Sequence, residues 1–237
     1  MKLQIYCDTN IGKIREENED SVYISGETVP FVAMVADGMG GHNAGKTASS
    51  KAISILSEKK LRAETLEQAI CEASGMLYHM TQENSELAQM GTTLTILLLE
   101  DERWTVGQVG DSRAYCLENH TLKQITKDHS YVQTLVDKGA ITPEEARVHP
   151  YKNIITRAVG MEQVEADLYS GQAQPGQIFL LCSDGLINHV PDEELKEILC
   201  GPETIGEKGN RLMSLALERG GRDNISIILI QEAGESV

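Results

Sequence analysis

The chain has 237 residues, and 36 acidic against 21 basic side chains give it a formal net charge of −15 at pH 7. Nucleic acids are bound mainly through Lys and Arg, so this balance argues against a nucleic-acid partner. Charged residues make up an ordinary 24% of the chain, which excludes wholesale disorder. Because 41% of the residues are hydrophobic but only 4% are aromatic, we expect a core of aliphatic side chains.

Membrane and secretion signals are missing from the sequence. No apolar stretch reaches the length of a membrane span, and the first residues, MKLQIYCDTN, lack the apolar run of a signal peptide. We therefore expect a cytoplasmic protein that binds no membrane. The five cysteines are scattered without a metal-binding or redox spacing, and we interpret them as reduced structural thiols.

The first third of the chain predicts two strands followed by two helices. Apolar runs predict strands at residues 3–7 and 31–36, and helical periodicity predicts a helix over about residues 44–56. Thr65 and Gln68 have the spacing of a capping box, and an apolar face continues from them to Met80, so we predict a second, amphipathic helix there.

The remainder of the chain predicts hairpins and one more long helix. The elements in chain order are strands at residues 93–99 and 103–109, separated by an acidic turn at 100–102, a strand at 178–183, a helix at about 202–219 that stops at Gly220-Gly221, and a strand at 225–230. Hairpins, rather than regular strand-helix alternation, indicate antiparallel sheets covered by helices. No repeat or linker divides the chain, so we expect a single domain.

Residues 127–160 have a different character. Short helical pieces are interrupted by Gly139, Pro143 and Pro150, and the segment is polar enough to be an exposed insertion. Two interpretations stay open, a mobile flap beside a functional site and an ordinary surface excursion.

Three carboxylates occur at predicted strand ends. Asp37 and Asp184 each follow an apolar run and are themselves followed by Gly, and Asp223 directly precedes the last apolar run. One Asp-Gly pair is most often a turn, but three such carboxylates brought together would repel one another unless cations neutralised them. Oxygen ligands, including the carbonyl of Gly38, select Mg²⁺ or Mn²⁺. Two such ions about 3.5–4 Å apart can activate a shared water and orient a phosphoryl group.

Arg15 lies shortly before the acidic pair Glu19-Asp20 in GKIREENEDS. A guanidinium can bind phosphate oxygens bidentately, which an acidic protein with a phosphate substrate needs. Read alone, the segment is more typical of a solvated charge run.

Seven segments together resemble the metal-dependent protein phosphatases, the type 2C or PPM family, and in particular their bacterial single-domain members. They stand in the family's order and cover nearly the whole chain: TNIGKIREENEDS, VADGMGGHNAGKTAS, MGTTLT, VGDSRAY, HPYKNIITRAVG, LLCSDGL and GGRDNISIILI. The resemblance implies an α+β fold in which two antiparallel β-sheets pack as a sandwich flanked by pairs of helices. It also implies that residues 127–160 are the family's flap, which influences substrate choice.

The resemblance implies a role for each matching residue. The metal ligands would be Asp37, Gly38, Asp184 and Asp223, with Asp111 helping Asp184 to hold a third ion. Arg15 would bind the substrate phosphate, and Glu19 and Asp20 would contact waters on the metals. Met39 stands where animal members have a His proposed to protonate the leaving group, and His42 is an alternative donor that is more typical of a structural residue.

The implied activity is that of a protein-serine/threonine phosphatase with two Mn²⁺ or Mg²⁺ ions, or three. Water activated by the metals would attack phosphoserine or phosphothreonine directly, without a covalent enzyme intermediate. We expect a monomer whose partners are phosphoproteins, together with an opposing Ser/Thr kinase and its substrates.

Two other functions stay open. A catalytically silent binding module should have lost a metal aspartate, whereas all three are present here. A hydrolase of small phosphoesters would use the same chemistry. A cysteine phosphatase is rejected, because no thiol lies in a phosphate-cradling Gly/Arg loop. Because both enzyme and substrate are anionic, we expect added salt to screen their repulsion and to lower KM modestly for acidic phosphopeptides.

Overall fold

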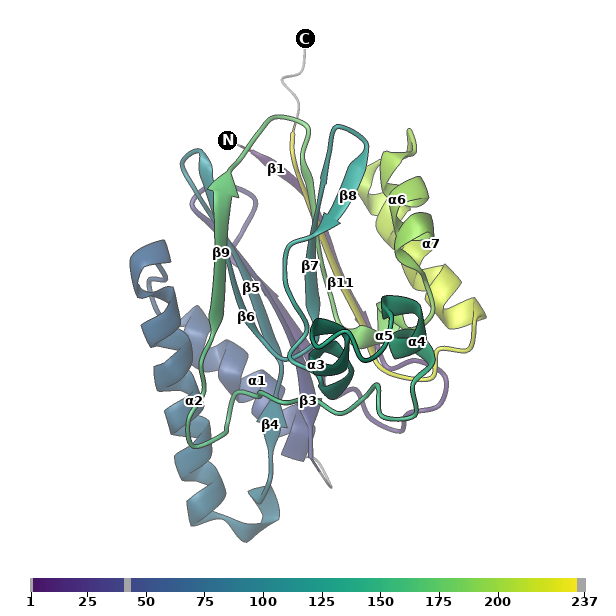
Figure 1. The fold of residues 1–237 in the computed structure, drawn as a ribbon. Helices are drawn as coiled ribbons and strands as arrows, with labels where there is room; N and C mark the ends of the chain where they lie inside the picture. The colour runs from purple at the N-terminus through teal and green to yellow at the C-terminus, as the bar shows by residue number, and fades with distance from the viewer. Residues whose placement is uncertain (1, 41–43, 234–237) are drawn as a thin grey trace.

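Two antiparallel sheets face each other and each carries a pair of helices on its outer side (Figure 1). The computed structural model describes residues 2–40 and 44–233. This architecture confirms the predicted α+β sandwich. Among the described residues, none of the helices combines the length and the hydropathy that a membrane span requires.

The first sheet joins the two ends of the chain. Its strand order is β1-β11-β10-β7-β8, with bounds β1 Leu3–Asn10, β11 Ile225–Glu232, β10 Ile178–Cys182, β7 Arg113–Glu118 and β8 Thr121–Gln124. Helices α6 (Asp192–Cys200) and α7 (Ile205–Glu218) cover its outer face, and the short α5 (Asp184–Ile187) follows β10 directly (Figure 1).

The second sheet is built from the first half of the chain and one later strand. Its order is β2-β3-β5-β6-β9, with the short β4 also paired to β3, and the bounds are β2 Asp20–Ile24, β3 Phe31–Met39, β4 Gly91–Thr92, β5 Leu94–Glu100, β6 Arg103–Val109 and β9 Asp167–Gln172. Helices α1 (Ala44–Ser57) and α2 (Leu66–Glu83) cover it, and short 3₁₀ turns precede and follow α2 at Ala63–Thr65 and Ser85–Leu87.

Core packing explains the unbroken apolar runs. In β5, Leu94, Ile96 and Leu98 pack under α1 and α2, whereas Leu97 and Leu99 face the other sheet. Successive residues of a strand point to opposite faces, so a strand covered on both faces must be apolar throughout. The edge strands β8 and β9 instead alternate between exposed and partly buried residues, and apolar runs did not predict them.

Several predicted boundaries need correction. The capping box at Thr65 and Gln68 is wrong: the Thr65 side chain caps nothing, because the chain enters α2 through a 3₁₀ turn, and Gln68 donates to Glu72 instead. Glu100 belongs to β5, where it pairs with Arg103, so the turn is shorter than predicted. The helix predicted from residue 202 begins at Ile205, and α6 was not predicted.

Residues 127–160, which we call the flap segment, lie between β8 and β9. They contain two short helices, α3 (Tyr131–Asp137) and α4 (Pro143–Val148), near the end of the sandwich where α5 begins (Figure 1). Several of their apolar side chains are exposed, among them Val148, Tyr151 and Ile154.

Candidate active site

The first pair of predicted site residues lies at the end of β3. Asp37 and Gly38 directly precede Met39, its last residue, and Asp20 at the start of β2 is directly opposite Asp37 in the antiparallel register. The loop before β2 therefore brings Glu19 to the same edge, where the Gly38 N–H donates to the Glu19 carbonyl at 3.2 Å.

The opposing sheet supplies two more carboxylates. Asp184 follows β10 and Asp223 precedes β11, and these two strands are antiparallel neighbours, so the end of one lies beside the start of the other. Asp111 follows β6 in the second sheet. These carboxylates lie far apart in the sequence, at the ends of separate strands. Because neighbouring strands run in opposite directions, the fold brings them together at one edge of the sandwich.

A cavity of about 230 Å³ is the place where these residues meet. Its wall includes Arg15, Glu19, Asp37, Gly38, Met39, Thr93, Asp111, Asn153, Ile155, Asp184, Asp223 and Asn224. Every predicted site residue except Asp20 lines it, and the flap segment contributes Asn153 and Ile155. His42 lies outside the described residues.

Hydroxyl groups fix the backbone around Asp37. Its N–H donates to Thr93 Oγ1 at 2.9 Å, and Thr92 Oγ1 donates to its carbonyl at 3.0 Å. Thr93 Oγ1 in turn shares a 2.7 Å hydrogen bond with Ser112 Oγ, beside Asp111. Gly38 allows this packing, because a Cβ there would collide with the Gly45 carbonyl.

Asp20 lies behind the cavity and ties the two sheets together. It is 6% exposed, and its Oδ2 accepts hydrogen bonds from Ser183 at 2.7 Å and from Ser226 at 2.6 Å. Its other oxygen, Oδ1, is buried with no hydrogen-bond partner among the described residues. A buried carboxylate oxygen without a partner is costly, so Asp20 has one acceptor available for a further ligand.

The carboxylates raise one another's pKa. Burial raises the pKa of Asp37 well above its usual value, and the charges of Asp20 and Asp184 raise it further. Burial is also the largest cause of the raised pKa of Asp184, followed by the charge of Asp223. For Asp111 the causes are burial and then Asp184. This cluster therefore requires protons or cations to neutralise it.

Arg15 is the cation that the structure places against the cluster. Its Nη2 donates to Asp223 Oδ2 at 2.9 Å, and its side chain is 48% exposed. The hydrogen bond to Asp223 raises the already high pKa of Arg15, so the guanidinium stays charged. It stands at the mouth of the cavity with donors left for a phosphate group.

The donor set fits hard divalent cations in its chemistry, since all its ligand atoms would be carboxylate and carbonyl oxygens. The free Oδ1 of Asp20 and the mutual repulsion of the aspartates also fit such ions. In the present arrangement, however, no three His, Cys, Asp or Glu side chains of the described residues are grouped to hold one ion. Asp223 is paired with Arg15, and Asp184 Oδ2 accepts from Asn188 at 3.0 Å.

Asn224 is a structural residue of the site that the sequence reasoning did not single out. Its Oδ1 accepts from the Glu19 N–H at 2.8 Å, and its Nδ2 donates to the carbonyls of Ile11 and Glu17, both at 2.9 Å. It thus fastens the Arg15 loop to the start of β11. The signal in the sequence that could have identified Asn224 is its position directly after the predicted metal ligand Asp223, in GGRDN.

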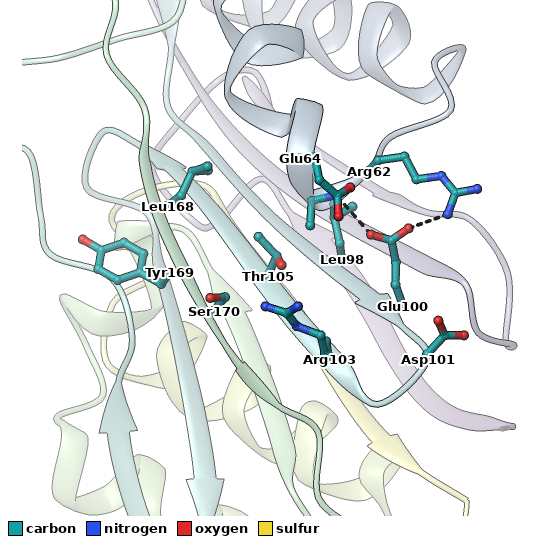
Figure 2. A pocket seen from close by; sticks show the side chains of 11 residues that line it. Arg62, Glu64, Leu98, Glu100, Asp101, Arg103, Thr105, Leu168, Tyr169 and Ser170 are labelled. Carbon is teal, nitrogen blue, oxygen red and sulfur yellow. Dashed lines mark hydrogen bonds and ion pairs between the residues drawn. The ribbon is translucent and has the colours of Figure 1, made fainter.

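A larger cavity, about 600 Å³, lies at the opposite end of β5 and β6 (Figure 2). Two of its charged side chains, Arg62 and Glu100, are paired with each other. Glu100 accepts from Arg62 at 3.1 Å and from the Ala63 N–H at 3.1 Å. None of the predicted metal ligands lines this cavity, so it is a less suitable site for phosphate chemistry than the smaller cavity.

Comparisons with known proteins agree with this geometry. The family profile described as Protein phosphatase 2C matches residues 15–214. The serine/threonine phosphatase stp of Listeria monocytogenes is 40% identical over 236 residues, covering 94% of this chain and 93% of the relative. The serine/threonine protein phosphatase PstP of Mycobacterium tuberculosis is 41% identical over 92% of this chain, which spans 43% of that longer protein.

Solved structures give the same result. The crystal structure of the Mycobacterium tuberculosis phosphatase PstP/Ppp matches with a TM-score of 0.90 and 39% identity, over 98% of this chain and 99% of that one. A structure of the PstP catalytic domain in complex with two manganese ions matches with a TM-score of 0.87 and 38% identity, over 97% and 98% of the two chains.

The chain belongs to the protein phosphatase 2C family of metal-dependent phosphoric monoester hydrolases. Within that family, the chain is similar, over nearly its whole length, to serine/threonine protein phosphatases of bacteria.

Proposed function

We propose that this chain removes phosphate from phosphoserine and phosphothreonine side chains of proteins at the 230 Å³ cavity, acting as one catalytic domain. The observation that carries the proposal is the meeting of Asp37, Asp184 and Asp223 from two sheets with the exposed Arg15. The full-length similarity to serine/threonine phosphatases supports the same substrate class.

We assign two divalent cations, Mn²⁺ or Mg²⁺, to Asp37, the Gly38 carbonyl, Asp184 and Asp223. Asp111 and Asp184 would hold a third. When bound, such ions supply an activated water and neutralise phosphate charge. Glu19 and Asp20 stand behind these ligands, where they would accept hydrogen bonds from waters around the ions, as the free Oδ1 of Asp20 permits.

The chain's own residues bind and orient the phosphate group. Arg15 offers guanidinium donors to the phosphate oxygens that the aspartates alone would repel. The hydrogen bonds from the Asp37 N–H to Thr93 and between Thr93 and Ser112 hold the backbone of Asp37 in place. The Asp37 carboxylate therefore does not have to be reorganised when substrate arrives.

The shape of the site favours a protein substrate over a small phosphoester. The cavity adjoins two larger cavities of about 470 and 530 Å³, with which it shares wall residues such as Asn153. A peptide could extend along them on either side of the phosphoresidue. We infer that phosphoproteins and an opposing kinase are the partners of a monomeric, cytoplasmic enzyme.

Removal of the central carboxylate tests this function. In Asp37→Asn, we expect kcat on a phosphothreonine peptide to fall by roughly 100-fold or more, because a carboxylate ligand proposed for the metal ions is lost. EDTA should abolish turnover of the unaltered protein, and Mn²⁺ should restore it. Initial rates of phosphate release are the measurement.

The matched control is Asp101→Asn, which removes the same charge at the β5–β6 turn, far from the cavity. Asp101 has a positive φ of 51°, which Asn also tolerates. Turnover that is independent of metal, or full activity in Asp37→Asn, contradicts the proposal. Faster turnover of nucleotides and sugar phosphates than of the peptide would favour the small-phosphoester alternative, and folded protein without any turnover would favour a silent module.

A further inference from the structure

A basic cavity of about 530 Å³ adjoins the candidate active site. Its wall carries four cationic side chains, Arg15, Lys152, Arg219 and Arg222, and it shares Arg15, Asn153 and Asp223 with the active-site cavity. Four cations around one cavity stand out in a chain with a formal net charge of −15.

Two of these cations are already neutralised. Arg15 is paired with Asp223 at 2.9 Å, and Arg219 is paired with Glu194 at 2.8 Å. Lys152 Nζ forms no ion pair within the part of the chain that the structure describes, and it donates to the neutral Asn188 Oδ1 at 2.5 Å. The guanidinium of the exposed Arg222 forms no ion pair with the residues that the structure describes.

Hydrogen bonds give this wall a defined shape. His189 Nδ1 lies 2.9 Å from the Gly185 carbonyl, and its Nε2 faces the Arg222 N–H at 3.4 Å. These contacts fit the neutral tautomer that donates from Nδ1 and accepts at Nε2. Arg219 Nη1 also donates to the His189 carbonyl at 3.0 Å. The segment that carries Arg222 is thus fastened to the segment that follows α5.

The two unpaired cations come from separate parts of the fold. Lys152 belongs to the flap segment, and Arg222 directly precedes Asp223 at the entry to β11. Both line a cavity that begins where the phosphate-binding Arg15 stands. A peptide whose phosphoresidue lies at Arg15 would therefore come within reach of them within a few residues, since an extended chain advances about 3.3 Å per residue.

We propose that Lys152 and Arg222 form an anion subsite, which binds a carboxylate or a second phosphate on the substrate close to the phosphoresidue that is hydrolysed. The inference rests on the proposed phosphatase function and specifies its substrate class, acidic or multiply phosphorylated segments. The subsite also supplies the local electrostatic attraction that an anionic enzyme needs to bind an anionic peptide.

The test compares three phosphothreonine peptides that differ only around the phosphoresidue: neutral flanks, flanking Glu residues, and a neighbouring phosphoserine. We expect the unaltered protein to have a kcat/KM about tenfold higher for the two anionic peptides than for the neutral one, with the difference in KM. Lys152→Met combined with Arg222→Gln should bring this ratio close to one. The Glu and phosphoserine peptides separate a carboxylate site from a phosphate site.

Arg103→Gln is the matched control. Arg103 is an exposed cation in the cavity of Figure 2. It is the first of the seven residues of β6, and the other end of this strand, at the active site, is roughly 20 Å away at the usual strand rise. This variant should keep the preference for anionic peptides. An equal loss in Arg103→Gln, or no preference in the unaltered protein, overturns the subsite.

Failure of the proposed function has a different signature. In that case the neutral peptide is not hydrolysed with Mn²⁺ at all, and fluorescence anisotropy of the labelled peptides still measures the subsite. Tighter binding of the anionic peptides that is lost in the double variant supports it, and equal binding of all three peptides overturns it. Thermal melts show whether the variants are folded, and we expect no change because Lys152 and Arg222 have no ion pair to lose.

Discussion

At the scale of single residues, His129 shows how the site is supported from outside. The side chain is 6% exposed, its Nδ1 accepts the Gly110 N–H at 3.1 Å, and its Nε2 faces Asp167 Oδ2 at 3.2 Å. Only the neutral tautomer with its proton on Nε2 satisfies both contacts. Gly110 has a φ of 100° and leads directly into Asp111, so His129 holds the turn that positions this carboxylate.

His129 makes stability depend on pH with a defined sign. Burial lowers the pKa of His129 below its usual value of 6.5. As the pH falls, His129 is therefore protonated in the unfolded chain at a higher pH than in the folded protein. The stability that neutral His129 contributes is complete above about pH 6.5 and is lost as the pH falls toward the lowered pKa.

In His129→Leu, the Gly110 N–H loses its acceptor, and we expect a loss of about 1–3 kcal/mol in the free energy of unfolding at pH 7.5. The deficit should shrink at about pH 5.5, where the unaltered protein is itself destabilised. Urea denaturation at the two pH values measures both quantities. His79→Leu, at an exposed position of α2, should show neither effect, and a deficit that is the same at both pH values contradicts the role of neutral His129.

At the scale of elements, burial patterns were more predictable than helix starts. Continuous apolar runs indicated the central strands β3, β5, β6, β10 and β11 correctly, because such strands are covered on both faces, but they missed β7. The spacing of Thr and Gln at residues 65 and 68 was misleading, because whether a side chain caps a helix depends on how the chain enters it. Thr204 and Glu207 do form a reciprocal capping box at the start of α7, although that helix was predicted to begin about three residues earlier.

The two threonines make a matched pair for experiment. Thr204→Ala removes a side chain that accepts from the Glu207 N–H at 3.3 Å, and we expect it to cost about 1 kcal/mol, or roughly 2–4 °C in Tm. Thr65→Ala removes a side chain that caps nothing and should change Tm by much less. Calorimetric melts of the two variants side by side measure this difference. Equal losses would mean that the cap contacts of α7 contribute nothing.

At the scale of the whole molecule, the sequence predicted residues that the fold brings together at one cavity, but not what surrounds them. Asp37, Asp184 and Asp223 could be chosen because each borders an apolar run. The hydrogen bonds from Ser183 and Ser226 to Asp20 join strands from opposite sheets, and no local spacing encodes them. The basic cavity likewise combines the flap segment with residues 219–223, so a net charge computed along the chain conceals it.

This charge distribution reverses the salt dependence that net charge alone suggests. A net charge of −15 predicts that added salt lowers KM for acidic phosphopeptides, whereas Lys152 and Arg222 at the cavity predict that it raises KM. Charges in direct contact with the peptide outweigh distant ones, because the Debye length is only about 10 Å at 0.1 M salt.

We therefore expect KM for the peptide with flanking Glu residues to rise severalfold between about 0.05 and 0.3 M NaCl. In Lys152→Met combined with Arg222→Gln, the local attraction is gone and only the repulsive field remains, so KM should fall modestly over the same range. Initial rates at each salt concentration test this change of sign, and a KM that falls in the unaltered protein shows that the long-range field dominates.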